Sequence, residues 1–150
     1  MFPPDAEILD VGACDGTWHK LLPEYTNMDA IEIFEPNLRN LTGYRKVFHA
    51  NMIGFEYDHY DLIIFGDVIE HMHVQDAQNV LAYADPRCDD MIIAVPFRLP
   101  QGAVYGNHWE IHIQDDLTPA IFAERYPGYD VLVDPGNSYL YYHTGDRTEQ

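Results

Sequence analysis

Acidic and histidine side chains that could handle protons gather in two segments of the sequence. The first segment contains Asp67, Glu70 and His71, which directly follow a run of apolar residues. An imidazole has an unperturbed pKa of about 6.5, so His71 is the best candidate for a general base at neutral pH. Asp67 is a weaker candidate, because a carboxyl group with a pKa of about 3.9 holds a proton poorly unless it is desolvated. The alternative is structural: His71 bonds a neighbouring loop, and the two acids orient it or cap the next helix.

The second segment is a long stretch that ends at His112 and is rich in functional side chains. Loops longer than about 12–15 residues are usually functional or mobile, so we expect this one to select the substrate, and we include His108 among the catalytic candidates. Alternate residues of an extended chain share a face, so His108, Glu110 and His112, or His71 and His73, could hold a metal ion. A chain with 8 histidines often gathers several in loops without a metal. No metal is therefore assigned from the sequence.

A turn with two glycines follows the first apolar run, at Gly12 and Gly16. Dinucleotide-binding folds need G-x-G-x-x-G, in which each glycine has a steric role. Aligning Gly12 with the first glycine places Cys14 at the second and Thr17 at the third, so two of three positions fail. A P-loop is excluded because no Gly-Lys-Ser/Thr follows. What remains is an acidic residue, Asp10, and two glycines around a tight bend.

This turn resembles the first motif of the class I S-adenosylmethionine-dependent methyltransferases, approximately (D/E)-x-G-x-G-x-G. The match covers residues 8–16 except that Cys14 replaces the middle glycine. A cysteine there is tolerable if its φ is negative and costly if its φ is positive. The resemblance implies that the loop wraps the methionine part of S-adenosylmethionine. The implied contacts are Asp10, Gly12, Ala13, Cys14 and Gly16.

Two further matches follow in the order that the family requires. Glu32 lies near the end of the second predicted strand, where the resemblance implies a carboxylate that accepts hydrogen bonds from both ribose hydroxyls, with Ile33 beside it. Asn51 and Met52 follow the third strand, where family members often carry an Asp that contacts the adenine. The amide oxygen of Asn51 can accept the same hydrogen bond, and Met52 can pack on the adenine face. Both residues could instead be ordinary loop residues.

The fourth match is the most specific one. Residues 61–71 resemble the pattern D-x-x-x-x-x-D-V-h-E-H (h is apolar) of the small-molecule branch of the family. The resemblance extends over roughly residues 5–143, and Asp67 belongs to both the implied cofactor site and the candidate catalytic group. Enzymes of the family that methylate amino groups of nucleic-acid bases normally have an Asn/Asp-Pro-Pro-aromatic motif here, where this chain has Gly66 and Asp67 instead. A nucleic-acid substrate is therefore not expected.

Short apolar runs alternate with helical patterns along the chain and predict the elements that position these residues. The predicted strands are Glu7–Val11, Met28–Ile33, Lys46–His49, Asp61–Phe65, Met91–Val95, Tyr129–Val133 and Tyr139–Tyr142. The predicted helices cover Thr17–Leu22, Asn37–Leu41, the periodic residues 74–84, and a segment that begins with Thr118 as N-cap and Pro119 as first residue, with Leu117 and Phe122 as a hydrophobic staple. Residues 53–59 are too few for a crossover helix.

This alternation predicts an α/β protein with a doubly wound, Rossmann-like, mostly parallel sheet and helices on both faces. The last two strands are joined by a short turn and should form an antiparallel hairpin. The resemblance implies seven strands in the order 3-2-1-4-5-7-6 within a three-layer α/β/α domain. The length of 150 residues and the 47% of apolar residues suit one domain, residues 1–150, with its own core.

Charge and composition limit the partners. A net charge of −17 disfavours a surface that grips nucleic acid or anionic lipid. No apolar stretch approaches the roughly 18–20 residues of a membrane span, and no secretory signal is visible. Two cysteines are too few for a disulfide framework, so we interpret Cys14 and Cys88 as small buried residues and expect a cytoplasmic protein.

The sequence therefore predicts an S-adenosylmethionine-dependent methyltransferase with a small-molecule or protein side-chain acceptor. The main alternative is a non-catalytic module of the same fold that binds the cofactor or a partner protein, and a dinucleotide-dependent reductase is a weaker one. The chain lacks the helices that commonly cover the substrate in this family. We therefore expect closure of the cofactor site by homo-oligomerisation or by the loop that follows the fifth strand.

Overall fold

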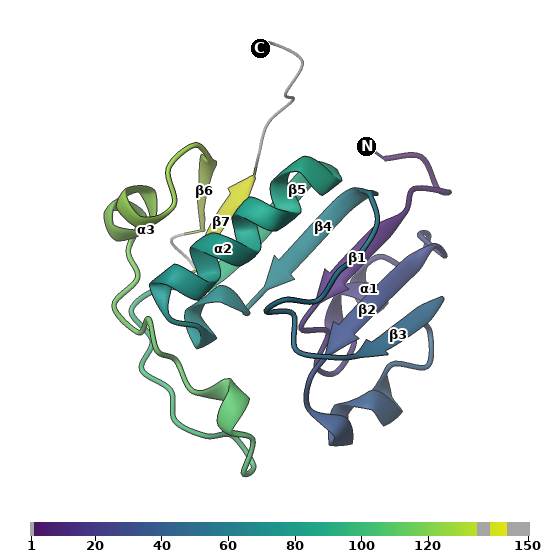
Figure 1. Ribbon diagram of the computed structural model, residues 1–150, viewed down its shortest axis with the longest axis horizontal. Coiled ribbons are helices and arrows are strands. Elements are labelled where there is room, and N and C mark those ends of the chain that lie inside the picture. Colours follow the sequence, from purple (N-terminus) through teal and green to yellow (C-terminus); the bar gives the residue numbers. More distant parts are fainter. Residues whose placement is uncertain (1, 135–138, 144–150) are drawn as a thin grey trace.

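The computed structural model describes the backbone of residues 2–134 and 139–143, and the side chains of residues 2–130. These residues contain one sheet with the strand order β3-β2-β1-β4-β5-β7-β6. The five strands from β3 to β5 are parallel, whereas β7 pairs antiparallel with both β5 and β6. The strands are β1 (Ile8–Val11), β2 (Met28–Glu32), β3 (Lys46–His49), β4 (Tyr60–Gly66), β5 (Cys88–Pro96), β6 (Asp130–Asp134) and β7 (Tyr139–His143). The predicted Rossmann-like parallel α/β sheet is confirmed (Figure 1).

Helices lie on both faces of the sheet, with α2 in front of it and α1 behind it in Figure 1. The helices are α1 (Thr17–Leu21), α2 (Val74–Ala84) and α3 (Pro119–Arg125), and short 3₁₀ helices are η1 (Glu35–Asn40), η2 (Ile69–His71), η3 (Asp85–Arg87) and η4 (His108–Glu110). Strand residues such as Ile63 pack in one buried cluster with Leu81 of α2 and Phe122 of α3. Their neighbours, such as Ile64, pack on the opposite face with Trp18 of α1. Successive strand residues thus feed two cores.

The helix starts and faces follow the predicted patterns. The buried residues of α2 are those of the predicted periodic stripe, namely Ala77, Val80, Leu81 and Ala84. At the start of α3, the hydroxyl of Thr118 accepts a hydrogen bond from the backbone N–H of Ile121 (3.1 Å), and Pro119 is the first helical residue. Leu117 and Phe122 are both fully buried, as a hydrophobic staple requires.

The β3 side of the sheet is covered differently. The predicted helix at Asn37–Leu41 is a 3₁₀ helix instead, η1, which begins beside Pro36. Within the described chain, no helix connects β3 to β4. Aromatic rings from this connection fill the space: Phe55 contacts Phe48, with ring centroids 5.2 Å apart, and Tyr57 meets Tyr83 of α2 edge-on at 5.3 Å. Large rings therefore bury apolar surface where a crossover helix would otherwise lie.

None of the helices in the described part of the chain is long and apolar enough to span a membrane.

Candidate active site

A cavity of about 660 Å³ opens at the edge of the sheet where the parallel strands end. Its walls come from the segments that follow β1, β2, β3, β4 and β5. Open α/β sheets bind their ligands in crevices at these carboxyl ends, because the ends of all parallel strands meet at one edge. The volume falls in the range of small-molecule sites, about 300–1,000 Å³. The position and size of this cavity make it the candidate active site.

The glycine turn after β1 forms one wall and depends on left-handed backbone. Gly12 has a φ of 68°, and a Cβ at this position would lie 2.6 Å from a methyl carbon of Val68. Both the dihedral angle and the close approach therefore require glycine. Cys14 has a φ of 50°, which is the costly case for the residue that replaces the middle glycine. The interpretation of Cys14 as a buried residue was wrong, because its side chain is exposed, whereas Cys88 is buried as predicted.

Glu32 locks the glycine turn to the end of β2. Its two carboxylate oxygens accept hydrogen bonds from the backbone N–H groups of Cys14 (2.8 Å) and Phe34 (2.7 Å). The residue is only 5% exposed, yet it contributes to the cavity wall. Each carboxylate oxygen can accept more than one hydrogen bond, so the anchored carboxylate keeps acceptor capacity toward a ligand. The arrangement suits recognition of two adjacent hydroxyls.

The structure places two predicted contacts, Asp10 and Gly16, outside the cavity wall. The side chain of Asp10 is fully buried, and the hydroxyl of Tyr44 donates a hydrogen bond to its Oδ2, while Oδ1 has no partner among the described residues. Burial raises the pKa of Asp10 to about 7, and the nearby Glu32 adds to the effect. Gly16 is the N-cap of α1, with a φ of 77°. Both residues therefore belong to the turn and its supports, and neither lines the cavity.

The segment after β3 contributes the predicted Asn51 and Met52 to the cavity wall, and Ile33 after β2 lies there too. The amide oxygen of Asn51 accepts a hydrogen bond from the backbone N–H of Ile53 (2.9 Å) and so shapes the turn. The half-buried Met52 offers an apolar surface. These residues form the end of the cavity nearest to β2 and β3.

Asp67 and His71, which follow β4, both line the cavity. Asp67 is exposed and has a φ of 55°, a conformation that Asp tolerates better than most residues. The Nδ1 of His71 donates a hydrogen bond to the carbonyl oxygen of Ile111 (3.2 Å) in the loop after β5. His71 thus has both the predicted cavity position and the predicted loop contact. Burial, together with the neighbouring His112, lowers the pKa of His71, so its imidazole is neutral at pH 7.

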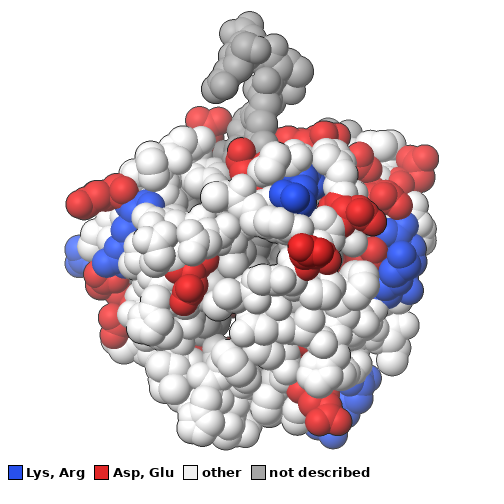
Figure 2. All heavy atoms as spheres, viewed as in Figure 1, with Lys and Arg blue, Asp and Glu red and all other residues white. Residues whose placement is uncertain are grey.

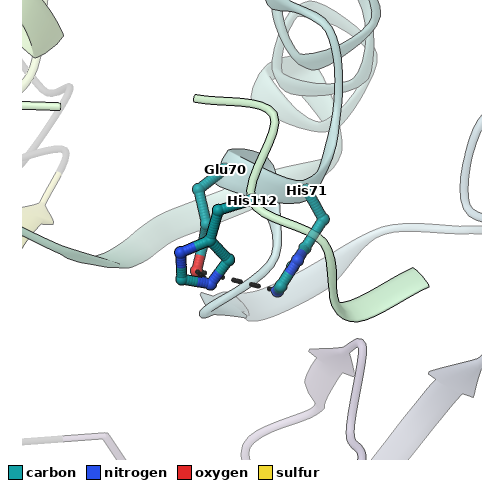
Figure 3. A group of neighbouring side chains, drawn as sticks. All are labelled: Glu70, His71 and His112. Carbon is teal, nitrogen blue, oxygen red and sulfur yellow. Dashed lines mark ion pairs between the residues drawn. The ribbon is translucent and has the colours of Figure 1, made fainter. Parts of the chain in front are cut away.

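Glu70, His71 and His112 form a compact cluster in which the three side chains point toward one another (Figure 3). The Nε2 atoms of His71 and His112 lie 3.8 Å and 3.9 Å from Oε1 of Glu70. Both imidazoles line the cavity, while Glu70 is fully buried behind them. Burial and the charge of Asp67 raise the pKa of Glu70 well above its usual range. Sequence spacing had suggested His73 and His108 as further members, but the structure brings neither into this cluster.

Backbone hydrogen bonds hold the cluster together. The carbonyl oxygen of Glu70 accepts hydrogen bonds from the N–H groups of Ile113 (2.8 Å) and Gln114 (2.9 Å). The buried amide of Gln114 in turn donates to the carbonyl oxygens of Ile69 (2.8 Å) and Met72 (3.1 Å). Gln114 was missed by the sequence analysis, because a single Gln in a loop carries no pattern that distinguishes it. It fixes the loop after β5 against η2.

The predicted catalytic residue His108 is exposed and lies outside the cavity wall. It occupies the 3₁₀ turn η4, where the side chain of Asn107 accepts a hydrogen bond from the N–H of Trp109 (3.0 Å). Successive residues of such a turn point in different directions, so Trp109 and Glu110 reach the cavity and His108 does not. Residues of the loop after β5 therefore form one side of the cavity wall, and His108 is not among them.

The cavity combines negative charge with an apolar mouth. Its acidic residues are Asp15, Glu32, Asp67, Asp76 and Glu110, and no Lys or Arg belongs to the wall as far as the described residues show. Large apolar side chains at the mouth are partly exposed, namely Leu21, Ile53, Leu99, Trp109 and Ile113. Figure 2 shows the lower part of the face, where the loop after β5 lies, as mostly uncharged. The acidic wall favours a cationic ligand, and the apolar mouth favours an apolar one.

Comparison with known proteins gives no relative in sequence: no family model matches the chain, and no curated protein matches it. Solved structures share its fold. DhpI in complex with SAH has a TM-score of 0.75 and 12% identity, covering 97% of this chain and 79% of that chain. The plantazolicin methyltransferase BpumL in complex with SAH has a TM-score of 0.66 and 13% identity, covering 95% and 76%.

A SAM-dependent methyltransferase from Archaeoglobus fulgidus has a TM-score of 0.67 and 13% identity, covering 93% of this chain and 85% of that chain. At such identities the likeness establishes the fold. The chain has the class I S-adenosylmethionine-dependent methyltransferase fold that its four motifs predicted.

Proposed function

We propose that this chain binds S-adenosylmethionine in the cavity and transfers its methyl group to a small-molecule or protein side-chain acceptor. The observation that carries the proposal is the carboxylate of Glu32, held by the backbone of the glycine turn at the cavity wall. The proposal is supported by the fold, because the solved DhpI and BpumL structures of the same fold contain SAH. It is also supported by charge, since a sulfonium cation suits an acidic wall without Lys or Arg among the described residues.

Each part of the cofactor has a matching wall. Gly12, Ala13 and Cys14 would hold the methionine part, and Glu32 would accept hydrogen bonds from the ribose hydroxyls. The adenine would lie between Ile33, Asn51 and Met52, and Asp67 would face the sulfonium end from β4. When bound, S-adenosylmethionine supplies an electrophilic methyl group whose thioether leaves without protonation. The protein has to orient the acceptor and deal with its proton.

The acceptor side lies between the apolar mouth and the residues that follow β4. Leu99, Trp109 and Ile113 are 44%, 55% and 45% exposed and line the cavity, so an apolar or aromatic acceptor would bury their surface. Glu110 and Asp67 disfavour an anionic acceptor. We assign activation of the acceptor to His71, because it is neutral at pH 7 and faces the cavity beside these residues.

Isothermal titration calorimetry with S-adenosylmethionine and SAH tests the binding half of the proposal. We expect one site per chain for each compound, and absence of binding would overturn the proposal. Formation of SAH over a panel of phenols, other small hydroxyl and amino compounds, and peptides tests the catalytic half. Binding without turnover of any acceptor would favour the non-catalytic module instead.

A further inference from the structure

The carboxyl group of Glu70 lacks the partners that a buried acid normally has. The residue is fully buried, and neither carboxyl oxygen has a hydrogen-bond partner among the described residues. By contrast, the buried Asp29 accepts hydrogen bonds from the guanidinium of Arg45 (2.8 Å from both Nε and Nη2) and from the hydroxyl of Tyr60 (2.9 Å). Buried polar groups are nearly always satisfied by a partner, a water or an ion. Glu70 therefore indicates that a ligand completes its surroundings.

The two imidazoles beside Glu70 are oriented as acceptors. The Nδ1 of His71 meets the carbonyl oxygen of Ile111 at 3.2 Å, and the Nδ1 of His112 meets that of Leu99 at 2.6 Å. A carbonyl can only accept, so Nδ1 is the donor in each contact, and the Nε2 of a neutral ring with this tautomer has the lone pair. Such an Nδ1–carbonyl bond is the usual partner of a metal-bound histidine. Two imidazole nitrogens and the carboxyl group of Glu70 therefore converge.

The spacing of the three groups suits a metal ion. Their ligand atoms all lie within 4.8 Å of one another. Ligands at the usual distances of about 2.0–2.2 Å from an ion are roughly 3.0–3.4 Å apart, so a contraction of at most about 1.8 Å would close the site. Glu70 and His71 belong to one turn, and His112 is tied to it by the bonds of Ile113 and Gln114 to the Glu70 carbonyl. The ligands are thus preorganised by backbone, and both imidazoles face the cavity.

We propose that Glu70, His71 and His112 bind one divalent first-row transition-metal ion, such as Zn²⁺, Fe²⁺, Mn²⁺ or Co²⁺, with open coordination positions toward the cavity. Two imidazoles and one carboxylate favour these ions over Mg²⁺ and Ca²⁺, which prefer oxygen ligands. The surrounding acids Asp67 and Glu110, with no Lys or Arg in the described wall, add a potential that attracts cations.

The ion would determine the acceptor class, a step that rests on the proposed methyltransferase function. An ion facing the cavity would bind an acceptor hydroxyl and lower its pKa, so His71 would act through the metal instead of as a free base. The hydroxyl proton would leave to water at the cavity mouth. The oxygen lone pair would form the new O–C bond, and the electron pair of the broken C–S bond would stay on sulfur as a neutral thioether. The acceptor is then an apolar alcohol or phenol.

Titration of EDTA-treated protein with Co²⁺, followed by visible d–d absorption and by calorimetry, tests the site. We expect one ion per chain and a higher Tm with metal. Glu70→Gln and His112→Gln should each weaken Co²⁺ binding by at least about tenfold, since loss of outer partners alone costs about 10–100-fold. His59→Gln, an exposed histidine outside the cavity wall, is the matched control and should bind like the unaltered protein.

Absence of stoichiometric Co²⁺ binding, unchanged binding in Glu70→Gln, or an equal loss in His59→Gln would each overturn the metal site. If Glu70→Gln does not fold by circular dichroism, His112→Gln decides by the same criterion. SAH is titrated separately into the metal-free protein. SAH binding without Co²⁺ binding would reject the metal site and leave the proposed function intact. Co²⁺ binding without SAH binding would support the metal site and overturn the proposed function.

Discussion

Glu32 and Glu70 are buried at opposite ends of the cavity, and their carboxyl groups have opposite surroundings. At the β1–β2 end, both oxygens of Glu32 accept hydrogen bonds from backbone N–H groups of Cys14 and Phe34. At the β4–β5 end, both oxygens of Glu70 lack any such partner among the described residues, and two imidazoles face one of them. The protein satisfies the carboxylate of Glu32 by itself. In the proposed metal site a cation completes the surroundings of Glu70, and the two ends therefore take different ligands.

The first and largest expected effect is a loss of stability caused by a substitution in the glycine turn at the β1–β2 end. Gly12→Ala should lower the free energy of unfolding by about 2–4 kcal/mol, because a left-handed alanine costs roughly 1–2 kcal/mol and its overlap with Val68 adds a similar amount. Urea denaturation measures this loss. In a double-mutant cycle with Val68→Ala, the overlap should be relieved and the backbone strain retained. If Val68→Ala restored all of the stability lost in Gly12→Ala, contact with Val68 alone, and not backbone strain, would require glycine at this position.

A second prediction concerns Asp10, the other buried carboxyl group at the β1–β2 end. Burial raises the pKa of Asp10 to about 7 from 3.8, so the folded protein binds a proton that the unfolded chain has lost between these values. Stability contributed by this group therefore falls as pH rises through this window. Between pH 5 and 8, the free energy of unfolding should decline by roughly 2–3 kcal/mol more in the unaltered protein than in Asp10→Asn.

The exposed Asp58→Asn is the control for this pH dependence and should keep the slope of the unaltered protein. Denaturant unfolding at several pH values compares the three proteins. Equal slopes in Asp10→Asn and the unaltered protein would mean that Asp10 is ionised in the folded state over the whole range.

A third prediction concerns removal of the hydrogen-bonded carboxylate of Glu32. Glu32→Ala should weaken SAH binding by roughly 1–3 kcal/mol, because it removes the ribose acceptors and leaves the N–H groups of Cys14 and Phe34 without their carboxylate. Glu35→Ala removes an exposed acid outside the cavity wall and should bind SAH with unchanged affinity. Calorimetry compares both. An unchanged affinity in Glu32→Ala would discard the ribose role.

The smallest expected effect concerns the cysteine that departs from the family motif. Cys14→Gly should raise the stability by up to about 1 kcal/mol, because glycine removes the left-handed strain at a φ of 50° but adds entropy to the unfolded chain. Cys14→Ala keeps a Cβ and should match the unaltered protein within about 0.5 kcal/mol. Thermal unfolding distinguishes them, and an equal gain in both variants would attribute the effect to the thiol instead of the backbone.

Much of the fold could be predicted from local sequence patterns. The periodic residues of 74–84 give α2 its buried face, and Thr118 and Pro119 start α3, because periodicity and capping depend on residues a few positions apart. Where local preference is weak, the outcome differs. The predicted helix at Asn37–Leu41 is a 3₁₀ helix, since six residues that start beside a proline have little helical preference to override the connection between two strands.

The candidate site could be predicted only in part. Glu32 and His71 line the cavity as expected, because strand ends and motif spacing place them there. Asp10 and His108 do not, since the direction of a side chain depends on its strand face or turn position and not on its motif. The partnership of Glu70 with His112 was not predicted, because the two belong to different segments that meet only in the folded protein.

Local patterns and composition were enough to predict the order of strands and helices along the chain, the glycine turn, the acidic charge and the cofactor-type motif. The tertiary structure alone decided which polar groups share one buried space. Backbone bonds from Ile113 and Gln114 to the Glu70 carbonyl bring His112 against Glu70 and His71. Burial there excludes water from a carboxylate that no protein donor satisfies among the described residues. Because such an environment depends on long-range packing, the proposed metal site became visible only in three dimensions.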